Sequence, residues 1–82
     1  MKLPRDLDGR KLASLLHRYG YQVTRQTGSH IRLTSTEMGT EHHVTVPAHH
    51  EIKIGTLSAI LREIATYLDI ELTQLLEELF GE

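Results

Sequence analysis

The residues that invite a chemical interpretation lie in the stretch RQTGSHIR, from Arg25 to Arg32. It places His30 between two arginines and directly after the pair Gly28 and Ser29. A neutral imidazole accepts a proton near neutral pH, so His30 is suited to deprotonate a ribose 2′-hydroxyl and make its oxygen a nucleophile on the adjacent phosphorus. Arginine binds phosphate oxygens in a fork and stabilises the charge gathering on them. The stretch therefore predicts chemistry on a phosphodiester.

Further residues are candidates for contacting such a substrate. Those that carry a positive charge are Arg25, Arg32 and Lys53. Ser29, beside the turn at Gly28, offers a hydroxyl or a backbone donor to a phosphate, and His43 belongs to a neighbouring strand. The reaction requires no metal and no other cofactor. The competing interpretation is that His30 fills an exposed strand position and that the arginines only solubilise the strand.

The remaining histidines suggest a zinc site only at first sight. His42-His43 and His49-His50 are adjacent pairs, and neighbouring strand residues point to opposite faces, so each pair offers one ligand to a given centre. The chain has no cysteine and no HExxH spacing, so metal binding is not predicted. His42 is in phase with Val44 and is expected at the margin of the core.

Length and composition limit the alternatives. The 82 residues are expected to form a single domain, 1–82, with one modest core. The absence of cysteine excludes a disulfide framework and a thiolate nucleophile, and it fits a cytoplasmic location. No secretory signal and no apolar run long enough to span a bilayer is found, so no membrane association is expected.

Charge is distributed unevenly along the chain. Residues 1–62 hold nine basic and five acidic residues, a net charge of +4, whereas residues 63–82 hold six acidic and no basic residues. A basic body with an acidic tail, about 69–82, is able to engage a polyanion through one face, because local potential steers association. Two solvated faces without a binding role are the plainer interpretation.

Periodicity predicts the elements that position these groups. Asp8 caps a helix that ends at Gly20, and its apolar residues, at helical spacing, are Leu12, Leu15, Leu16 and Tyr19. A period of two then predicts strands on both sides of a turn at Gly28, and a third strand that Pro47 ends. Thr56 is expected to cap an amphipathic helix. Leucines continue at helical spacing over 57–80, as one long helix or as two with a break near Asp69.

The order helix, three strands, helix and helical tail predicts an α+β fold with a three-stranded antiparallel sheet and helices on one face. The inward residues are then Tyr21, Val23, Ile31, Leu33, Val44 and Val46. The residues expected to share the open face are Gln22, Thr24, His30, Arg32, His43 and Thr45.

The segments DGRKLASLLHRYGYQVTRQTGSHIRL and HHVTVPAHHEIKIGTLSAILREI, with the leucine-rich end, span most of the chain. Together they resemble the HicA family of toxins, which are small mRNA interferases of toxin–antitoxin systems. The most specific piece is RQTGSH, followed downstream by VTVP, a histidine-containing loop and KIGTL. The ordered set carries the resemblance, because each motif alone is weak.

The resemblance implies a double-stranded-RNA-binding-like α-β-β-β-α fold. It implies that His30, which matches the histidine of the family's GSH motif, is the catalytic residue of a metal-independent endoribonuclease acting on mRNA. Gly28 and Ser29 match the same motif and would shape the turn and the substrate approach. A HicB-type antitoxin protein is the implied partner, which binds the toxin and masks its active site.

Two other function classes stay open at this point. One is a non-catalytic RNA-binding module with the same fold, although such modules read duplexes with basic clusters at the start of their second helix, where this chain offers only Lys53. The other is a domain that binds only protein through its open face.

Overall fold

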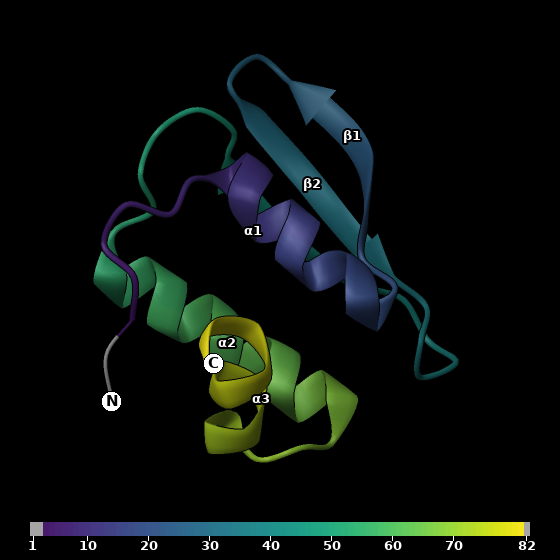
Figure 1. Cartoon of the computed structure of the whole chain (residues 1–82). Helices are drawn as coiled ribbons and strands as arrows, with labels where there is room; N and C mark the ends of the chain where they lie inside the picture. Colours follow the sequence, from purple (N-terminus) through teal and green to yellow (C-terminus); the bar gives the residue numbers. More distant parts are fainter. Residues whose placement is uncertain (1–2, 82) are drawn as a thin grey trace.

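The computed structural model of the chain describes residues 3–81. A helix is followed by a three-stranded sheet and two more helices (Figure 1). The elements in order are α1 (Gly9–Leu16), a 3-10 turn η1 (His17–Tyr19), β1 (Gln22–Thr27), β2 (His30–Ser35), β3 (His42–Pro47), α2 (Ile54–Leu68) and α3 (Leu72–Phe80). The predicted α+β class and α-β-β-β-α order with a C-terminal helical extension are confirmed. Within the described residues, no helix has the length and apolar character needed to cross a membrane.

The first helical segment begins and ends where the sequence predicts, although α1 itself ends at Leu16 and the 3-10 turn η1 completes the segment up to Gly20. The Asp8 side chain accepts a hydrogen bond of 2.8 Å from the backbone N–H of Lys11, which satisfies one of the free donors at the helix start. Gly20 has a φ of 83° and ends η1 in the left-handed conformation that favours glycine. Leu12 and Leu16 are fully buried.

The three strands form an antiparallel meander with β2 in the centre. Thr27 pairs with His30 across a two-residue turn, in which Gly28 has a φ of 58°. Glycine tolerates this conformation at no steric cost, which explains why it stands at the turn. The predicted hairpin is therefore confirmed, and its turn places His30 at the first position of β2.

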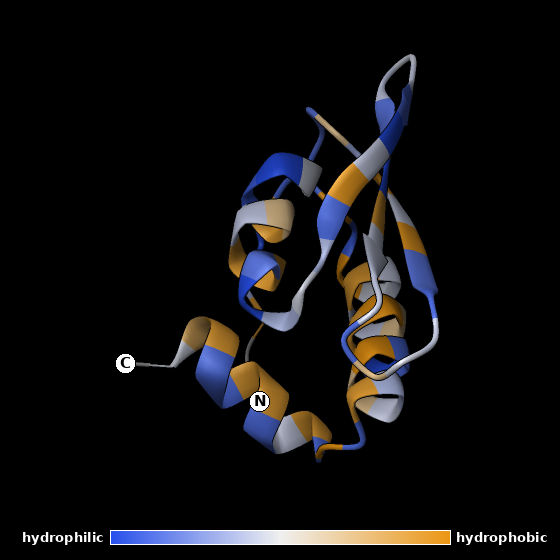
Figure 2. Cartoon of the chain, turned by 90° about the vertical axis from the view of Figure 1, so that its right-hand side faces the viewer, coloured by the Kyte–Doolittle hydropathy of each residue, from blue (hydrophilic) through white to orange (hydrophobic). Residues whose placement is uncertain are grey.

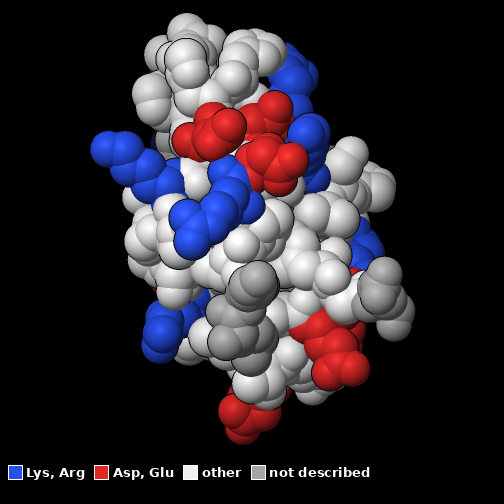
Figure 3. All heavy atoms as spheres, turned by 60° about the vertical axis from the view of Figure 1, so that its left-hand side comes forward, with Lys and Arg blue, Asp and Glu red and all other residues white. Residues whose placement is uncertain are grey.

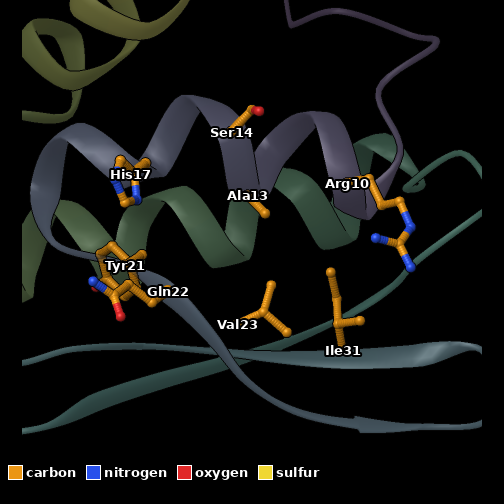
Figure 4. A pocket seen from close by; sticks show the side chains of 8 residues that line it. All are labelled: Arg10, Ala13, Ser14, His17, Tyr21, Gln22, Val23 and Ile31. Carbon is orange, nitrogen blue, oxygen red and sulfur yellow. The ribbon is translucent and has the colours of Figure 1, made fainter.

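The core lies on one face of the sheet. Figure 4 shows α1 and α2 on the same side of the strands, and Figure 2 shows hydrophobic and hydrophilic residues alternating along the strands. The buried strand residues that join the helical leucines in one cluster are Ile31, Leu33, Val44 and Val46. These four were expected to face the helices, and the structure confirms it.

Val23 departs from its predicted burial. It pairs with Leu33 and points toward α1, but 49% of its surface remains exposed. The helix residues that line the same hollow as Val23 include the small residues Ala13 and Ser14 (Figure 4). The side predicted for Val23 is correct, and the prediction that it belongs to the core is wrong, because these small helical residues leave it uncovered.

The start of the second helix was also wrongly predicted. Helix α2 begins at Ile54, and Lys53 stands before it in an extended conformation without a side-chain cap. The backbone N–H of Leu57 bonds to the Lys53 carbonyl at 2.8 Å, so Thr56 lies inside the first turn and does not precede it. A helix stabilised by tertiary packing of its apolar face does not require a capping side chain.

The open choice over residues 57–80 is decided by Asp69, which adopts a left-handed conformation with φ 58° and separates α2 from α3. Helix α3 then packs against the rest of the helical side. The Arg18 guanidinium donates to the Glu78 carbonyl at 2.7 Å, and the Tyr19 hydroxyl donates to the Glu78 carboxylate. This hydrogen bond lowers the pKa of Glu78, while burial raises the pKa of Tyr19 to about 12.

A glycine pair tests how tightly α1 packs on the sheet. A Cβ on Gly9 would lie 2.1 Å from the Pro47 carbonyl oxygen and 2.8 Å from Val46 Cγ2, whereas a Cβ on Gly55 would meet nothing within 4 Å. We expect Gly9→Ala to lower the free energy of unfolding by about 1–3 kcal/mol through overpacking. The matched Gly55→Ala in α2 should raise it by about 0.5–1 kcal/mol. Urea unfolding measures both, and a Gly9→Ala variant as stable as the wild type would contradict this packing.

Candidate functional site

The open face of the sheet carries the polar residues of alternate strand positions. Arg32 stands opposite Thr45, Thr34 stands opposite His43, and His30 stands opposite Pro47. Residues opposite each other in an antiparallel pair share a face. His30, His43 and Thr45 are exposed, and the other three are partly exposed. The predicted exposure of His30 on this face, two positions from Arg32, is confirmed.

An irregularity in β1 decides where Arg25 lies. The register shifts between Val23 and Arg25, and beyond it Arg25 pairs with Arg32. Strict alternation from Val23 would have sent Arg25 to the helix side, but one extra residue in a strand reverses the side of the residues that follow. The extra residue, Thr24, lies toward the open face, where its hydroxyl is 2.7 Å from the Thr34 hydroxyl. The bulge therefore turns Arg25 to the same face as His30.

These groups surround a shallow hollow of about 120 Å³. The side chains that matter chemically are Arg25, His30 and Arg32, and Thr27, Ile31 and Thr45 complete the lining. Pockets that enclose small molecules are typically several times larger. A hollow of this size suits one group of a longer chain that lies along the sheet, such as a phosphate with its neighbouring sugar.

The turn before His30 is hydrogen-bonded to the end of the neighbouring strand β3. The backbone N–H of Ala48, just after β3, donates to the Ser29 carbonyl at 2.6 Å. Ser29 and Gly28 are exposed at the hairpin tip, so the hydroxyl of Ser29 is accessible next to His30. The position predicted for this pair, at the turn beside the histidine, agrees with the structure.

Two predicted substrate contacts lie apart from this group. His43 stands opposite Thr34, four residues along β2 from His30, which is about 13 Å at the rise of an antiparallel strand. Its Nδ1 is 2.8 Å from the Thr34 hydroxyl and its Nε2 is 3.3 Å from Glu41. Lys53 stands at the start of α2 and does not line the hollow. The structure thus gathers Arg25, His30 and Arg32 but brings neither His43 nor Lys53 to the same hollow.

The sequence did not predict the cluster of side chains around His42, beyond the expectation that His42 borders the core. His42 is partly buried, with Nδ1 2.6 Å from the Tyr21 hydroxyl and Nε2 3.5 Å from Glu63. Its ring stacks on Tyr67 with centroids 5.0 Å apart. Burial of the Tyr21 hydroxyl raises its pKa, which keeps it protonated as a hydrogen-bond partner. This cluster ties β3 to α2, and its signal in the sequence is only the phase that His42 shares with Val44.

Another hollow, of about 350 Å³, opens between α1 and the start of β1. Figure 4 shows its lining, which includes His17 and Arg10 from the helical side and Val23 from β1. It contains none of the three residues grouped on the open face. Among residues 3–81, no three histidine, aspartate or glutamate side chains come together in a way that could hold a metal ion.

The acidic tail lies away from the open face. The buried side chains of α3, which are Leu75, Leu76 and Leu79, join the core cluster on the helical side. On the face drawn in Figure 3, acidic side chains lie at the lower end and also in the upper half, where lysine and arginine side chains surround them. The two signs of charge are therefore mixed on this face, but helix α3 packs on the helical side and does not cover the sheet face that carries His30.

The fold and the site define a small α+β protein that presents a histidine and two arginines on an uncovered sheet. Residues 9–65, more than half of the chain, match the family model described as the HicA toxin of bacterial toxin–antitoxin systems. The chain therefore belongs to the HicA toxin family, as the motif around His30 predicted. The match covers α1 through most of α2 and ends before α3. No curated protein and no solved structure matches the chain.

Proposed function

We propose that this protein is the toxin of a toxin–antitoxin pair and that it cuts mRNA in a metal-independent reaction with His30 as the catalytic base. The observation that carries this proposal is the grouping of His30 with Arg25 and Arg32 around one exposed hollow. The membership of this protein in the HicA toxin family supports its role as a toxin. Two arginines beside an exposed imidazole provide both phosphate binding and proton transfer, which a purely structural surface does not require.

In the proposed reaction the RNA backbone lies along the open face. The His30 imidazole accepts the proton of a ribose 2′-hydroxyl, and the 2′-oxygen attacks the adjacent phosphorus. The guanidinium groups of Arg25 and Arg32 hold the non-bridging phosphate oxygens and stabilise the negative charge that develops on them. Because the attacking oxygen belongs to the substrate itself, the reaction needs no metal-bound water, and RNA differs from DNA here by having the 2′-hydroxyl.

An inhibitor of RNA cleavage would act at the same open face of the sheet. We propose that a HicB-type antitoxin binds there and covers His30 while the protein is held inactive in the cytoplasm. The hollow is shallow and exposed, so a partner is able to exclude RNA by covering the surface without reshaping the protein. His43 and Lys53, which lie outside the hollow, remain candidates for contacts to the flanking nucleotides.

The central variant is His30→Ala, with His17→Ala as the matched control because His17 is also an exposed histidine but lies on the helical side. Under tightly controlled expression, we expect growth arrest and RNA cleavage from the wild type and from His17→Ala, and neither from His30→Ala. Adding EDTA should leave cleavage unchanged. The free energy of unfolding of His30→Ala should stay within about 0.5 kcal/mol of the wild type, because His30 is exposed.

If His30→Ala cut RNA as fast as the wild type, the proposed role of His30 would be wrong. If the wild type and His30→Ala bound RNA equally and neither cut it, the protein would be a non-catalytic RNA-binding module. If neither protein bound RNA, the open face would serve only a protein partner.

The arginines give a separate prediction for binding. With an RNA oligonucleotide that carries 2′-O-methyl groups and so lacks the nucleophile, Arg25→Ala and Arg32→Ala should each weaken binding. Each should also reduce the slope of log K against log salt by about 0.7, the value for one phosphate contact on a single strand. Arg62→Ala on α2, where the side chain bonds to Ser58, is the control and should leave the slope unchanged. If the slope of log K against log salt were the same for Arg25→Ala and Arg62→Ala, Arg25 would not contact the RNA, and the bulge that positions it would not belong to the binding surface.

A further inference from the structure

Two histidines near the proposed site have no role in the reaction proposed for His30. His49 and His50 follow β3 after one intervening residue, and both are exposed. The residue before them, Ala48, donates its backbone N–H to the Ser29 carbonyl at 2.6 Å, and Pro47 pairs with His30 itself. The segment that carries His49 therefore runs beside the turn that carries His30, although the two are far apart in the sequence.

The position of each histidine along this segment distinguishes the two. Pro47 stands opposite His30 and so shares the open face, whereas Ala48 has no exposed surface and belongs to the core. Residues 48–50 form bends, so the alternation of the strand does not continue through them. His49 is exposed and directly follows Ala48, so it is the histidine closer along the chain to the two contacts with the turn and with His30.

The proposed reaction requires a second proton transfer at this place. Displacement at phosphorus brings the entering and the leaving oxygen roughly in line on opposite sides of the phosphorus. An imidazole that takes the proton of the 2′-hydroxyl is therefore poorly placed to reach the 5′-oxygen, which leaves slowly as an unprotonated alkoxide. A separate acid on the other side of the phosphate removes this barrier.

We infer that the His49 imidazolium is this acid and that it protonates the leaving 5′-oxygen, an inference that rests on the proposed ribonuclease function. His30 removes the proton from the 2′-hydroxyl, the bond between the 2′-oxygen and phosphorus forms, and the bond between phosphorus and the 5′-oxygen breaks as His49 donates its proton. The products are a 2′,3′-cyclic phosphate and a 5′-hydroxyl. His30 ends protonated and His49 neutral, and exchange with water restores both; no atom changes its oxidation state.

The test compares two RNA substrates that differ only in the leaving atom. One has the ordinary linkage, and the other has sulfur in place of the bridging 5′-oxygen, so that its leaving thiolate needs no proton. His49→Ala should cleave the ordinary substrate about 10²- to 10⁴-fold more slowly than the wild type, the usual range for a lost acid or base, and the sulfur substrate at nearly the wild-type rate. His30→Ala should be defective on both substrates. His50→Ala, the adjacent exposed control, should cleave both like the wild type.

Each other outcome overturns the inference in an identifiable way. Equal losses of His49→Ala on both substrates would show that His49 positions the RNA and does not supply a proton. Wild-type cleavage of the ordinary substrate by His49→Ala would exclude any role for His49. A loss confined to His50→Ala would overturn the assignment of the acid to His49. If the wild type cleaved neither substrate, the proposed function itself would fail, and the inference with it. Because both substrates are tested on one preparation, a folding defect cannot imitate the expected selective rescue.

Discussion

The structure depends on a sheet that is covered on one side only. Among the described residues, the apolar surfaces of all three helices join a single cluster with one face of the strands. Burying a side chain such as Ile31 or Leu33 contributes about 1.5–3 kcal/mol, so the register of β2 is strongly fixed. A slip by one residue would bury His30 and expose Ile31. The same burial that holds the fold together therefore keeps the histidine in contact with solvent and substrate.

Most of the fold was predictable because the relevant signals are local. Asp8 and Gly20 mark the ends of the first helical segment through capping and a left-handed conformation, and Gly28 marks the hairpin. The alternation around Ile31 and the helical spacing of the leucines separate the core from the surface. His30 could be placed on the open face for the same reason, since a period of two leaves only two choices for each strand residue.

The features that the sequence did not reveal depend on contacts between distant segments. The bulge that turns Arg25 to the face of Arg32 follows from how β1 pairs with β2. The sequence around Thr24 contains no residue type that indicates a bulge. The exposure of Val23 depends on the small residues that α1 presents to it. Helix α2 starts at Ile54 and not after Thr56, because packing of its apolar face outweighs the propensity of one capping residue.

The central claim is that RNA lies along the open face of the sheet and against His30. Mapping of amide chemical shifts by NMR, with an RNA oligonucleotide whose 2′-O-methyl groups prevent cleavage, tests this claim most directly. We predict that the largest changes fall on Arg25 and on the exposed positions of β2 and β3, while α3 (Leu72–Phe80) remains unchanged. Changes concentrated on α2 and α3, with the amides around His30 unaffected, would contradict the account.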